Sequence, residues 1–181
     1  MKKYEFTGEV KRTWWGAELH RIRAVVAFGI VKVGELGGWI EKEANLSHEG
    51  KAWVYGNAKV YGNAEVYGDA KVYGDAEVWG NAKVYGDAVL FKAEHLLVIG
   101  AIGSRNDFTT FFRDKDNEIC VKCGCFLGKI DKFLQKVTAT HGTNKCALVY
   151  RAAVEIAKLQ IELTPAEEAP EMNEREDAEN E

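Results

Sequence analysis

The stretch from Gly56 to Phe91 reads GNAKVY GNAEVY GDAKVY GDAEVW GNAKVY GDAVLF, which is six hexapeptides without an insertion. Each copy has Gly, then Asn or Asp, then Ala, a variable residue, an aliphatic residue and an aromatic one. The first two positions predict a turn, because Gly tolerates positive φ and Asn or Asp visits the left-handed region. The next four positions predict a short strand. A fixed short period of this kind indicates a repeat architecture.

Two arrangements of such strands fit the pattern, a meander of small hairpins or a coil whose strands stack on later copies. Isolated hairpins of this size are marginal, and stacking pairs every strand on both sides, so we favour the coil. The block resembles the hexapeptide-repeat proteins, which form a left-handed parallel β-helix. The resemblance implies about eighteen residues for each turn of that helix. We therefore expect a mainly β fold, with an N-terminal β cap and a small C-terminal α+β domain.

That resemblance implies that the aliphatic residues point inward and that the alanines fill narrow corners. These positions are Val54, Val60, Val66, Val72, Val78, Val84 and Leu90, with Ala58, Ala64, Ala70, Ala76, Ala82 and Ala88. Three repeats apart, Lys59 meets Glu77 and Glu65 meets Lys83, which predicts ion pairs between stacked copies. Alternation of Lys and Glu for solubility alone explains the same pattern. The aromatic residues would form files, with Tyr55 over Tyr73 and Phe91, Tyr61 over Trp79, and Tyr67 over Tyr85.

The sequence divides into four segments. We expect a β cap at 1–50, the repeat block at 51–92, a β-hairpin with two helices at 93–163, and a disordered acidic tail at 164–181. Strand-like alternation covers 4–10 and 17–25, and Ile40, Leu46 and Ala52 already keep the six-residue spacing. The Gly-Gly-Trp at 37–39 and the Asn-Leu-Ser at 45–47 resemble the start of such repeats in proteins of bacteria and their phages.

The C-terminal segment has three predicted strands, at 95–102, 108–113 and 118–126, the last two joined by a turn at 114–117. Ile130, Phe133, Leu134 and Val137 predict an amphipathic helix. A second helix has a predicted apolar stripe at Val149, Ala153, Ile156, Gln160 and Leu163. The segment resembles a small domain that follows these repeats in phage and prophage proteins.

Composition and charge narrow the possible functions. The 181 residues are 46% apolar and 29% charged, and no apolar run approaches the length of a membrane span. The start of the chain lacks the apolar stretch of a signal peptide. The net charge of −4 hides an acidic C-terminus, since nine acids and one base lie from Glu162 onward. The remaining basic residues are dispersed, so we expect no nucleic-acid partner.

The four cysteines, Cys120, Cys123, Cys125 and Cys146, cluster in one region and predict a reducing cytoplasm rather than a disulfide framework. The Cys-x-x-Cys-x-Cys spacing raises the alternative of a zinc site. On one strand, Cys120 would face away from Cys123 and Cys125. We therefore expect packed thiols, no metal and no cofactor.

An acyltransferase or a carbonic-anhydrase-like enzyme is the activity that the β-helix resemblance first implies. Those activities depend on histidines carried by the coils, as bases or metal ligands. The block from Gly56 to Phe91 has none, and His20, His48, His95 and His141 lie outside it. We therefore predict no catalytic residue, with a hexapeptide-repeat acyltransferase as the enzyme alternative.

The best candidate for a ligand site is the loop that begins at Gly100. A Gly-Ser turn leaves backbone N–H groups for an anion, and Arg105 can donate two parallel hydrogen bonds. The predicted ligand-binding residues are Gly103, Ser104, Arg105, Asn106, Asp107, Thr109, Thr110 and Arg113. The alternative is a connector, with Phe108, Phe111 and Phe112 in the core of a hairpin; for these phenylalanines we prefer it.

These observations favour a non-enzymatic, phage-type accessory protein in the host cytoplasm. It would sequester a small anionic signalling nucleotide, a cyclic nucleotide or an ADP-ribose derivative, and so counter host antiviral defence. The alternative is a structural or protein-binding module that inhibits a host defence complex. We also expect a homo-oligomer, a trimer, whose aromatic faces with Tyr61, Trp79, Tyr67 and Tyr85 pack against partners.

Overall fold

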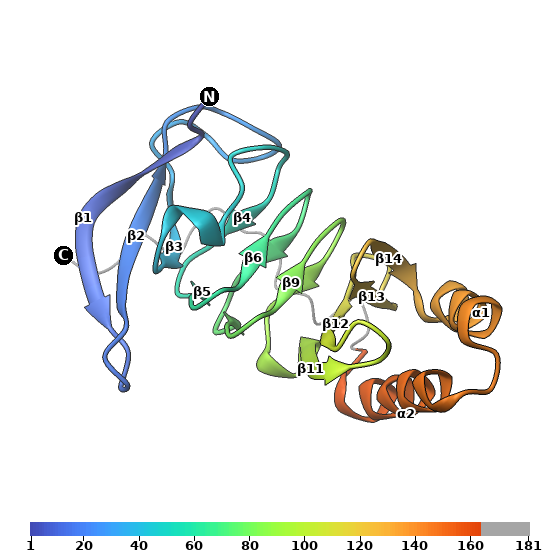
Figure 1. Ribbon diagram of the computed structural model, residues 1–181. Coiled ribbons are helices and arrows are strands. Elements are labelled where there is room, and N and C mark those ends of the chain that lie inside the picture. The colour runs from blue at the N-terminus through green and yellow to red at the C-terminus, as the bar shows by residue number, and fades with distance from the viewer. Residues whose placement is uncertain (164–181) are drawn as a thin grey trace.

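The computed structural model describes residues 1–163, and the predicted acidic tail at 164–181 lies outside the described residues. The molecule is elongated (Figure 1), with the N-terminal hairpin at one end and the two helices at the other. Strands β1 (Tyr4–Arg12) and β2 (Glu18–Ala24) form an antiparallel hairpin, close to the strands predicted there. Strand β3 (Leu36–Ile40) pairs antiparallel with β2 and parallel with the first repeats.

Each hexapeptide contributes a strand of two residues between turns. These strands are β4 (Trp53–Val54), β5 (Lys59–Val60), β6 (Glu65–Val66), β7 (Lys71–Val72), β8 (Glu77–Val78), β9 (Lys83–Val84) and β10 (Val89–Leu90). Each pairs in parallel with the strand three repeats along, so that Val54 faces Val72 and Val72 faces Leu90. The glycine of each turn has a positive φ, between 51° and 73°.

The predicted left-handed parallel β-helix is wrong, because the strands do not join one continuous parallel solenoid. They fall into separate small sheets: a mixed sheet β1-β2-β3-β5-β8, parallel sheets β10-β7-β4 and β6-β9, and an antiparallel sheet at the C-terminal end. The physical reason is that each positive-φ Gly turn redirects the chain, so that consecutive two-residue strands lie in different sheets. The hairpin of the N-terminal segment shares a sheet with β5 and β8 of the repeats.

The interior between these sheets has the predicted composition. The seven aliphatic positions from Val54 to Leu90 and the six alanines are all at most 1% exposed. Their burial supplies most of the apolar core of this part of the chain. The burial that the resemblance implies for these positions is therefore confirmed.

One of the two ion pairs predicted between stacked repeats forms. Lys59 Nζ lies 2.5 Å from Glu77 Oε1. Glu65 faces Lys83 in the register of β6 and β9, but its carboxylate accepts from the Tyr85 hydroxyl at 2.8 Å. The aromatic files form ring contacts, with centroid distances of 5.1 Å for Tyr67–Tyr85 and 6.5 Å for Tyr61–Trp79. The variable and aromatic residues of repeats three copies apart are therefore neighbours in the structure.

The C-terminal part is an antiparallel sheet with two helices on one face (Figure 1). Its elements are β11 (Leu96–Ile102), β12 (Asp107–Arg113), β13 (Ile119–Cys123), β14 (Phe126–Lys129), α1 (Ile130–His141) and α2 (Lys145–Gln160). Phe111 packs with the helices, whereas Phe112 belongs to the core of the repeats. Phe108 stays partly exposed.

Two predictions for this part are wrong. The single strand expected at 118–126 is divided into β13 and β14, because Gly124 turns the chain with φ +55°. The buried face of α2 is Ala147, Tyr150, Ala153, Val154 and Ala157, so that Ala153 of the predicted stripe is buried but Ile156 is half exposed. Between residues 1 and 163, no helix has the length and apolar character needed to cross a membrane.

Candidate functional site

Three segments that are distant in sequence meet around the side chain of Tyr150 on α2. They are the turn between β11 and β12, the end of β13, and the connection between α1 and α2. This arrangement brings the predicted residues Gly103, Ser104, Arg105 and Thr109 to one end of the C-terminal sheet. We call the residues Gly103, Ser104, Arg105, Thr109, Cys123, His141, Cys146 and Tyr150 the Tyr150 site.

Gly103 allows Tyr150 to enter the turn. A β-carbon built on Gly103 would lie 1.9 Å from the Tyr150 hydroxyl oxygen, and the backbone of Gly103 has φ +72°. Tyr150 itself is 4% exposed. Both the close approach and the positive φ require glycine at this position.

A chain of hydrogen bonds runs from β12 through β13 to α2. The Thr109 hydroxyl donates to Cys123 Sγ at 3.4 Å, and the Cys123 thiol donates to the Tyr150 oxygen at 3.8 Å. Burial, followed by the contact with Cys123, raises the pKa of Tyr150 to about 12, while the nearby Ser104 hydroxyl acts in the opposite direction. Tyr150 is therefore a neutral phenol at physiological pH.

The connection between the helices completes the site. The ring of His141, at the end of α1, lies 5.9 Å from that of Tyr150. Cys146 lies in the first turn of α2 and also raises the pKa of Tyr150. Asn144 caps α2, because its side-chain oxygen accepts from the Ala147 N–H at 3.1 Å.

Arg105 lies across the neighbouring turn, between β13 and β14. A β-carbon built on Gly124 would lie 2.4 Å from a terminal nitrogen of the Arg105 guanidinium. Within residues 1–163, the structure shows no carboxylate within ion-pair distance of that guanidinium. Arg105 is exposed, so its charge borders the Tyr150 site and faces solvent.

The other predicted residues lie elsewhere or play a local role. Thr110 is buried and its hydroxyl accepts from the Lys83 N–H at 3.0 Å. Arg113 is also buried, donates to Asn117 at 2.8 Å, and lies over the ring of Phe91. These two residues hold the C-terminal sheet against the repeats, while Asn106 and Asp107 shape the exposed turn.

Sequence reasoning missed four residues of the Tyr150 site, namely Tyr150, Cys123, His141 and Cys146. One feature of the sequence could have indicated them. The connection between α1 and α2, at 142–144, is short, so α2 runs back to the end of the sheet where Gly103 lies. The thiols of the Cys-x-x-Cys-x-Cys run do not share a site: Cys120 donates to Asp114, Cys123 donates to Tyr150, and Cys125 is exposed.

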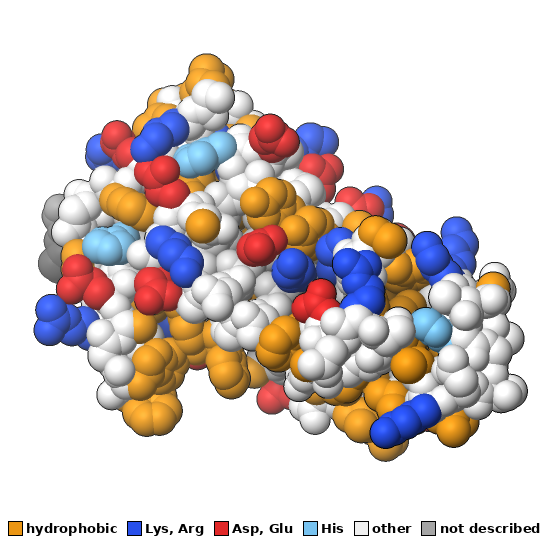
Figure 2. All heavy atoms as spheres, in the orientation of Figure 1, with side chains coloured by type: hydrophobic (Ala, Val, Ile, Leu, Met, Phe, Trp, Pro, Cys, Tyr) orange, Lys and Arg blue, Asp and Glu red, His pale blue; other side chains and the backbone are white. Residues whose placement is uncertain are grey.

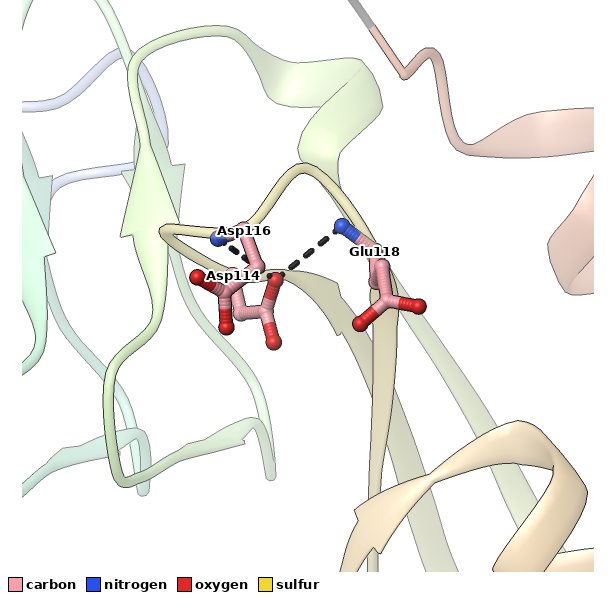
Figure 3. A group of neighbouring side chains, drawn as sticks. All are labelled: Asp114, Asp116 and Glu118. Carbon is pink, nitrogen blue, oxygen red and sulfur yellow. Dashed lines mark hydrogen bonds between the residues drawn. The ribbon is translucent and has the colours of Figure 1, made fainter.

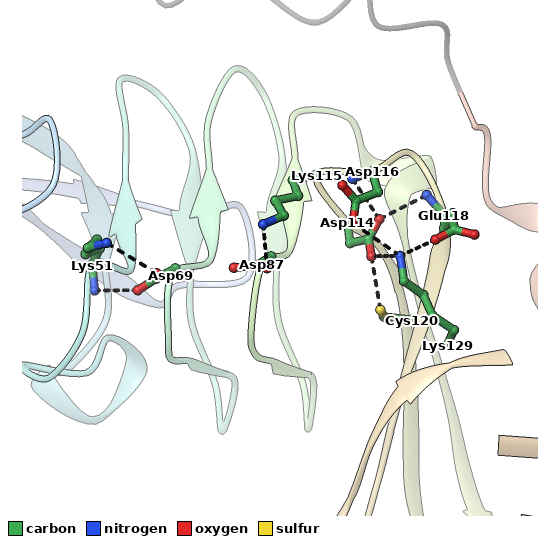
Figure 4. A network of polar contacts seen from close by, with 9 residues as sticks. All are labelled: Lys51, Asp69, Asp87, Asp114, Lys115, Asp116, Glu118, Cys120 and Lys129. Carbon is green, nitrogen blue, oxygen red and sulfur yellow. Dashed lines mark hydrogen bonds and ion pairs between the residues drawn. The ribbon is translucent and has the colours of Figure 1, made fainter. Parts of the chain in front are cut away.

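A second cluster contains three carboxylates, on Asp114, Asp116 and Glu118 (Figure 3), whose nearest oxygens lie within 4.8 Å of one another. Lys129 already provides a cation there: its Nζ bonds Asp114 and lies 2.5 Å from Glu118 and 3.7 Å from Asp116. Asp114 also accepts from the N–H groups of Asp116 and Glu118, at 3.0 Å each. Figure 4 shows Lys129 pointing into this cluster. We therefore interpret it as an ion pair that holds β14 to the β12–β13 turn.

The same view shows two further lysine–aspartate pairs along the turns of the repeats (Figure 4), Lys51 with Asp69 and Lys115 with Asp87. They line a groove of about 320 Å³ beside Phe28 and Tyr55. A smaller hollow of about 180 Å³ contains Trp14, Trp15 and the Lys59–Glu77 pair. These charges are already paired within the chain, which distinguishes both hollows from the Tyr150 site.

The surface around the C-terminal sheet is rich in cations. Figure 2 shows Lys and Arg side chains gathered over this sheet and its helices, at the right of the view. Lys122 donates to the Gly124 carbonyl at 2.6 Å, and Lys136 lies over the ring of Phe126. A field of this sign favours an anionic ligand near Arg105.

Comparison with protein-family models finds no matching family, and comparison with the curated proteins finds no matching sequence.

Proposed function

We propose that this chain binds a small anionic ligand of the nucleotide class at the Tyr150 site, without transforming it. The observation that carries the proposal is the placement of Arg105, held across Gly124 with no carboxylate partner among the described residues. A guanidinium in this setting can donate two parallel hydrogen bonds to a phosphate. The Ser104 hydroxyl and the positive-φ turn at Gly103 add donors beside it.

The surroundings suit a nucleotide better than a free inorganic anion. Phe108 is 37% exposed on the strand that follows the turn, and Phe126 is partly exposed beside Lys136. Exposed aromatic rings stack on bases, and the cations nearby favour the phosphates. A cyclic nucleotide or an ADP-ribose derivative combines both features in a small molecule.

Binding without catalysis is favoured by the protonation state of Tyr150. Because its pKa is raised to about 12, the phenol is neither a general base nor a nucleophile at neutral pH. Its buried side chain instead holds the turn that carries Ser104 and Arg105. A protein that only binds a signalling nucleotide lowers the free concentration of that signal. The phage-type resemblance of the sequence supports counter-defence as the biological setting.

The test is isothermal titration with a panel of cyclic mononucleotides, cyclic dinucleotides and cyclic ADP-ribose isomers. We expect submicromolar affinity for at least one ligand, and a loss of at least about tenfold, or 1.4 kcal/mol, in Arg105→Ala. Arg12→Ala is the matched control, because Arg12 is an exposed arginine paired with Glu18 on the distant hairpin. Absence of binding across the panel would overturn the proposal, as would equal losses in the two variants.

A further inference from the structure

Helix α2 has a second apolar face, opposite the face that packs on the sheet. Leu148, Ala152, Ile156 and Leu159 follow one another at i, i+4, i+8 and i+11, which places them on one stripe. Leu148 is 61% exposed, Ile156 50% and Leu159 89%. Figure 1 shows α2 on the outer side of the molecule, and Figure 2 shows hydrophobic side chains along the edge where it lies. A continuous apolar stripe on a surface helix indicates an interface.

We infer that this stripe is the contact between two copies of the chain, related by a two-fold axis that pairs α2 antiparallel with itself. Antiparallel pairing places Leu148 against the partner's Leu159 and Ala152 against the partner's Ile156. The small Ala152 then packs against the large Ile156 in the two central contacts of the pair. At each end, Leu148 packs against Leu159. Such a self-complementary surface closes as a dimer.

The charges beside the stripe favour the same orientation. Arg151, Glu155 and Lys158 lie along one border of the stripe, all exposed. Within the chain Lys158 pairs with Glu155 at 2.9 Å and Arg151 donates to the Thr138 hydroxyl at 2.6 Å, and these exposed contacts can be exchanged for contacts with a partner. The antiparallel register brings Arg151 opposite the partner's Glu155, twice in each dimer. A parallel register would instead place each of these charges against its own copy, and like charges in contact are unfavourable.

The segment that follows α2 is poorly suited to cover the stripe. Residues 164–181 contain one large apolar side chain, Met172, whereas the stripe offers four apolar positions. Eight of these residues are acidic, and acidic side chains do not fill the apolar positions of the stripe. A second copy of α2 satisfies both the apolar and the charged positions. A two-fold pair is an alternative to the trimer predicted from the sequence, and the oligomeric state distinguishes the two.

Light scattering coupled to size-exclusion chromatography tests this interface. We expect a dimer for the full chain and a monomer for Leu159→Asp, whose far-ultraviolet circular dichroism stays native because Leu159 is 89% exposed. Val33→Asp is the matched control, since Val33 is 66% exposed in a distant loop. A monomeric or trimeric wild type, or a dimer that Leu159→Asp leaves intact, would overturn the inference.

The orientation has its own test. Arg151→Glu and Glu155→Arg should each weaken the dimer at least about tenfold, because each creates two like-charge contacts in the antiparallel pair. The double variant restores the opposite charges and should recover the dimer. If the single variants dimerise like the wild type, the antiparallel register is wrong. Monomers that bind anionic lipid vesicles through the same stripe would contradict self-association altogether.

Discussion

The hydroxyl of Tyr150 fills the space that a side chain on Gly103 would need. The distance from a β-carbon on Gly103 to that oxygen would be 1.9 Å, which is far below van der Waals contact. A turn and a helix separated by almost fifty residues of sequence are thus fitted to each other. The fit fixes where Ser104 and Arg105, the next two residues of the turn, point relative to α2.

We therefore expect Gly103→Ala to lower the free energy of unfolding by about 3 kcal/mol, towards the upper end of single substitutions. Both overpacking against Tyr150 and the positive φ contribute. Gly80→Ala is the control: its φ of +67° is close to that of Gly103, but nothing lies within 4 Å, so only the backbone cost of about 1 kcal/mol remains. Urea denaturation followed by circular dichroism measures both. Equal losses in the two variants would show that Tyr150 does not occupy the turn.

A second pair of glycines tests the stacking of the repeats. A β-carbon on Gly68 would lie 2.9 Å from the backbone nitrogen of Gly86, whereas one on Gly80 would meet nothing within 4 Å. Their φ angles are similar, at +73° and +67°. Gly68→Ala should therefore destabilise the chain by about 1 kcal/mol more than Gly80→Ala. Thermal denaturation of the two variants measures this difference. A greater loss of stability in Gly80→Ala than in Gly68→Ala would argue against the observed register.

The pattern of the repeats predicted which side chains are buried and which repeats pair, but not where each sheet ends. Valine and alanine recur at fixed places, and burial follows from that recurrence alone. The sheet boundaries depend on features outside the repeats. The hairpin of β1 and β2 extends one sheet only, and parallel pairing already begins before the perfect repeats, with Leu46 beside Val66. Ile40 accordingly faces Val60, twenty residues on, while Val54 faces Val72.

The second helix shows why a stripe in sequence can mislead. Apolar residues lie on both faces of α2, with Ala147, Tyr150 and Val154 on one and Leu148 and Leu159 on the other. Periodicity alone does not say which face meets the sheet.

The Arg105 turn was predicted from local chemistry, but its neighbours Cys123 and Tyr150 come from other elements. Their convergence depends on tertiary packing, which no local pattern encodes.

A buried lysine makes the stability of the N-terminal part depend on pH. Lys3 is 3% exposed, and its Nζ donates to the Ala52 carbonyl at 2.7 Å. Burial lowers the pKa of Lys3 from 10.5 to about 8, although the Asp69 carboxylate acts in the opposite direction. Between these two values the unfolded chain binds a proton that the folded chain has released. The contribution of Lys3 to the free energy of unfolding therefore rises with pH from about 8 towards 10.5.

We expect this rise to reach up to about 3 kcal/mol and to disappear in Lys3→Met. Below pH 8 both states are protonated, so the slope due to Lys3 vanishes there. Lys2→Met is the control, because Lys2 is an exposed lysine paired with Glu43. Urea unfolding at several pH values measures the slope. An unchanged slope in Lys3→Met would show that Lys3 keeps an ordinary pKa.

The last prediction concerns the lysine within the acidic cluster. Lys129→Met leaves the carboxylates of Asp114, Asp116 and Glu118 without their cation, and Asp114 is only 4% exposed. We expect a loss of about 3 kcal/mol in the free energy of unfolding.

Calcium should recover part of the stability that Lys129→Met loses, because carboxylate oxygens this close together can share one divalent ion. The melting temperature of the wild type should not respond to calcium, because the Lys129 ammonium already neutralises the cluster. Lys132→Met, an exposed change on α1, should behave like the wild type. A wild type that calcium stabilises as much as Lys129→Met would contradict this account.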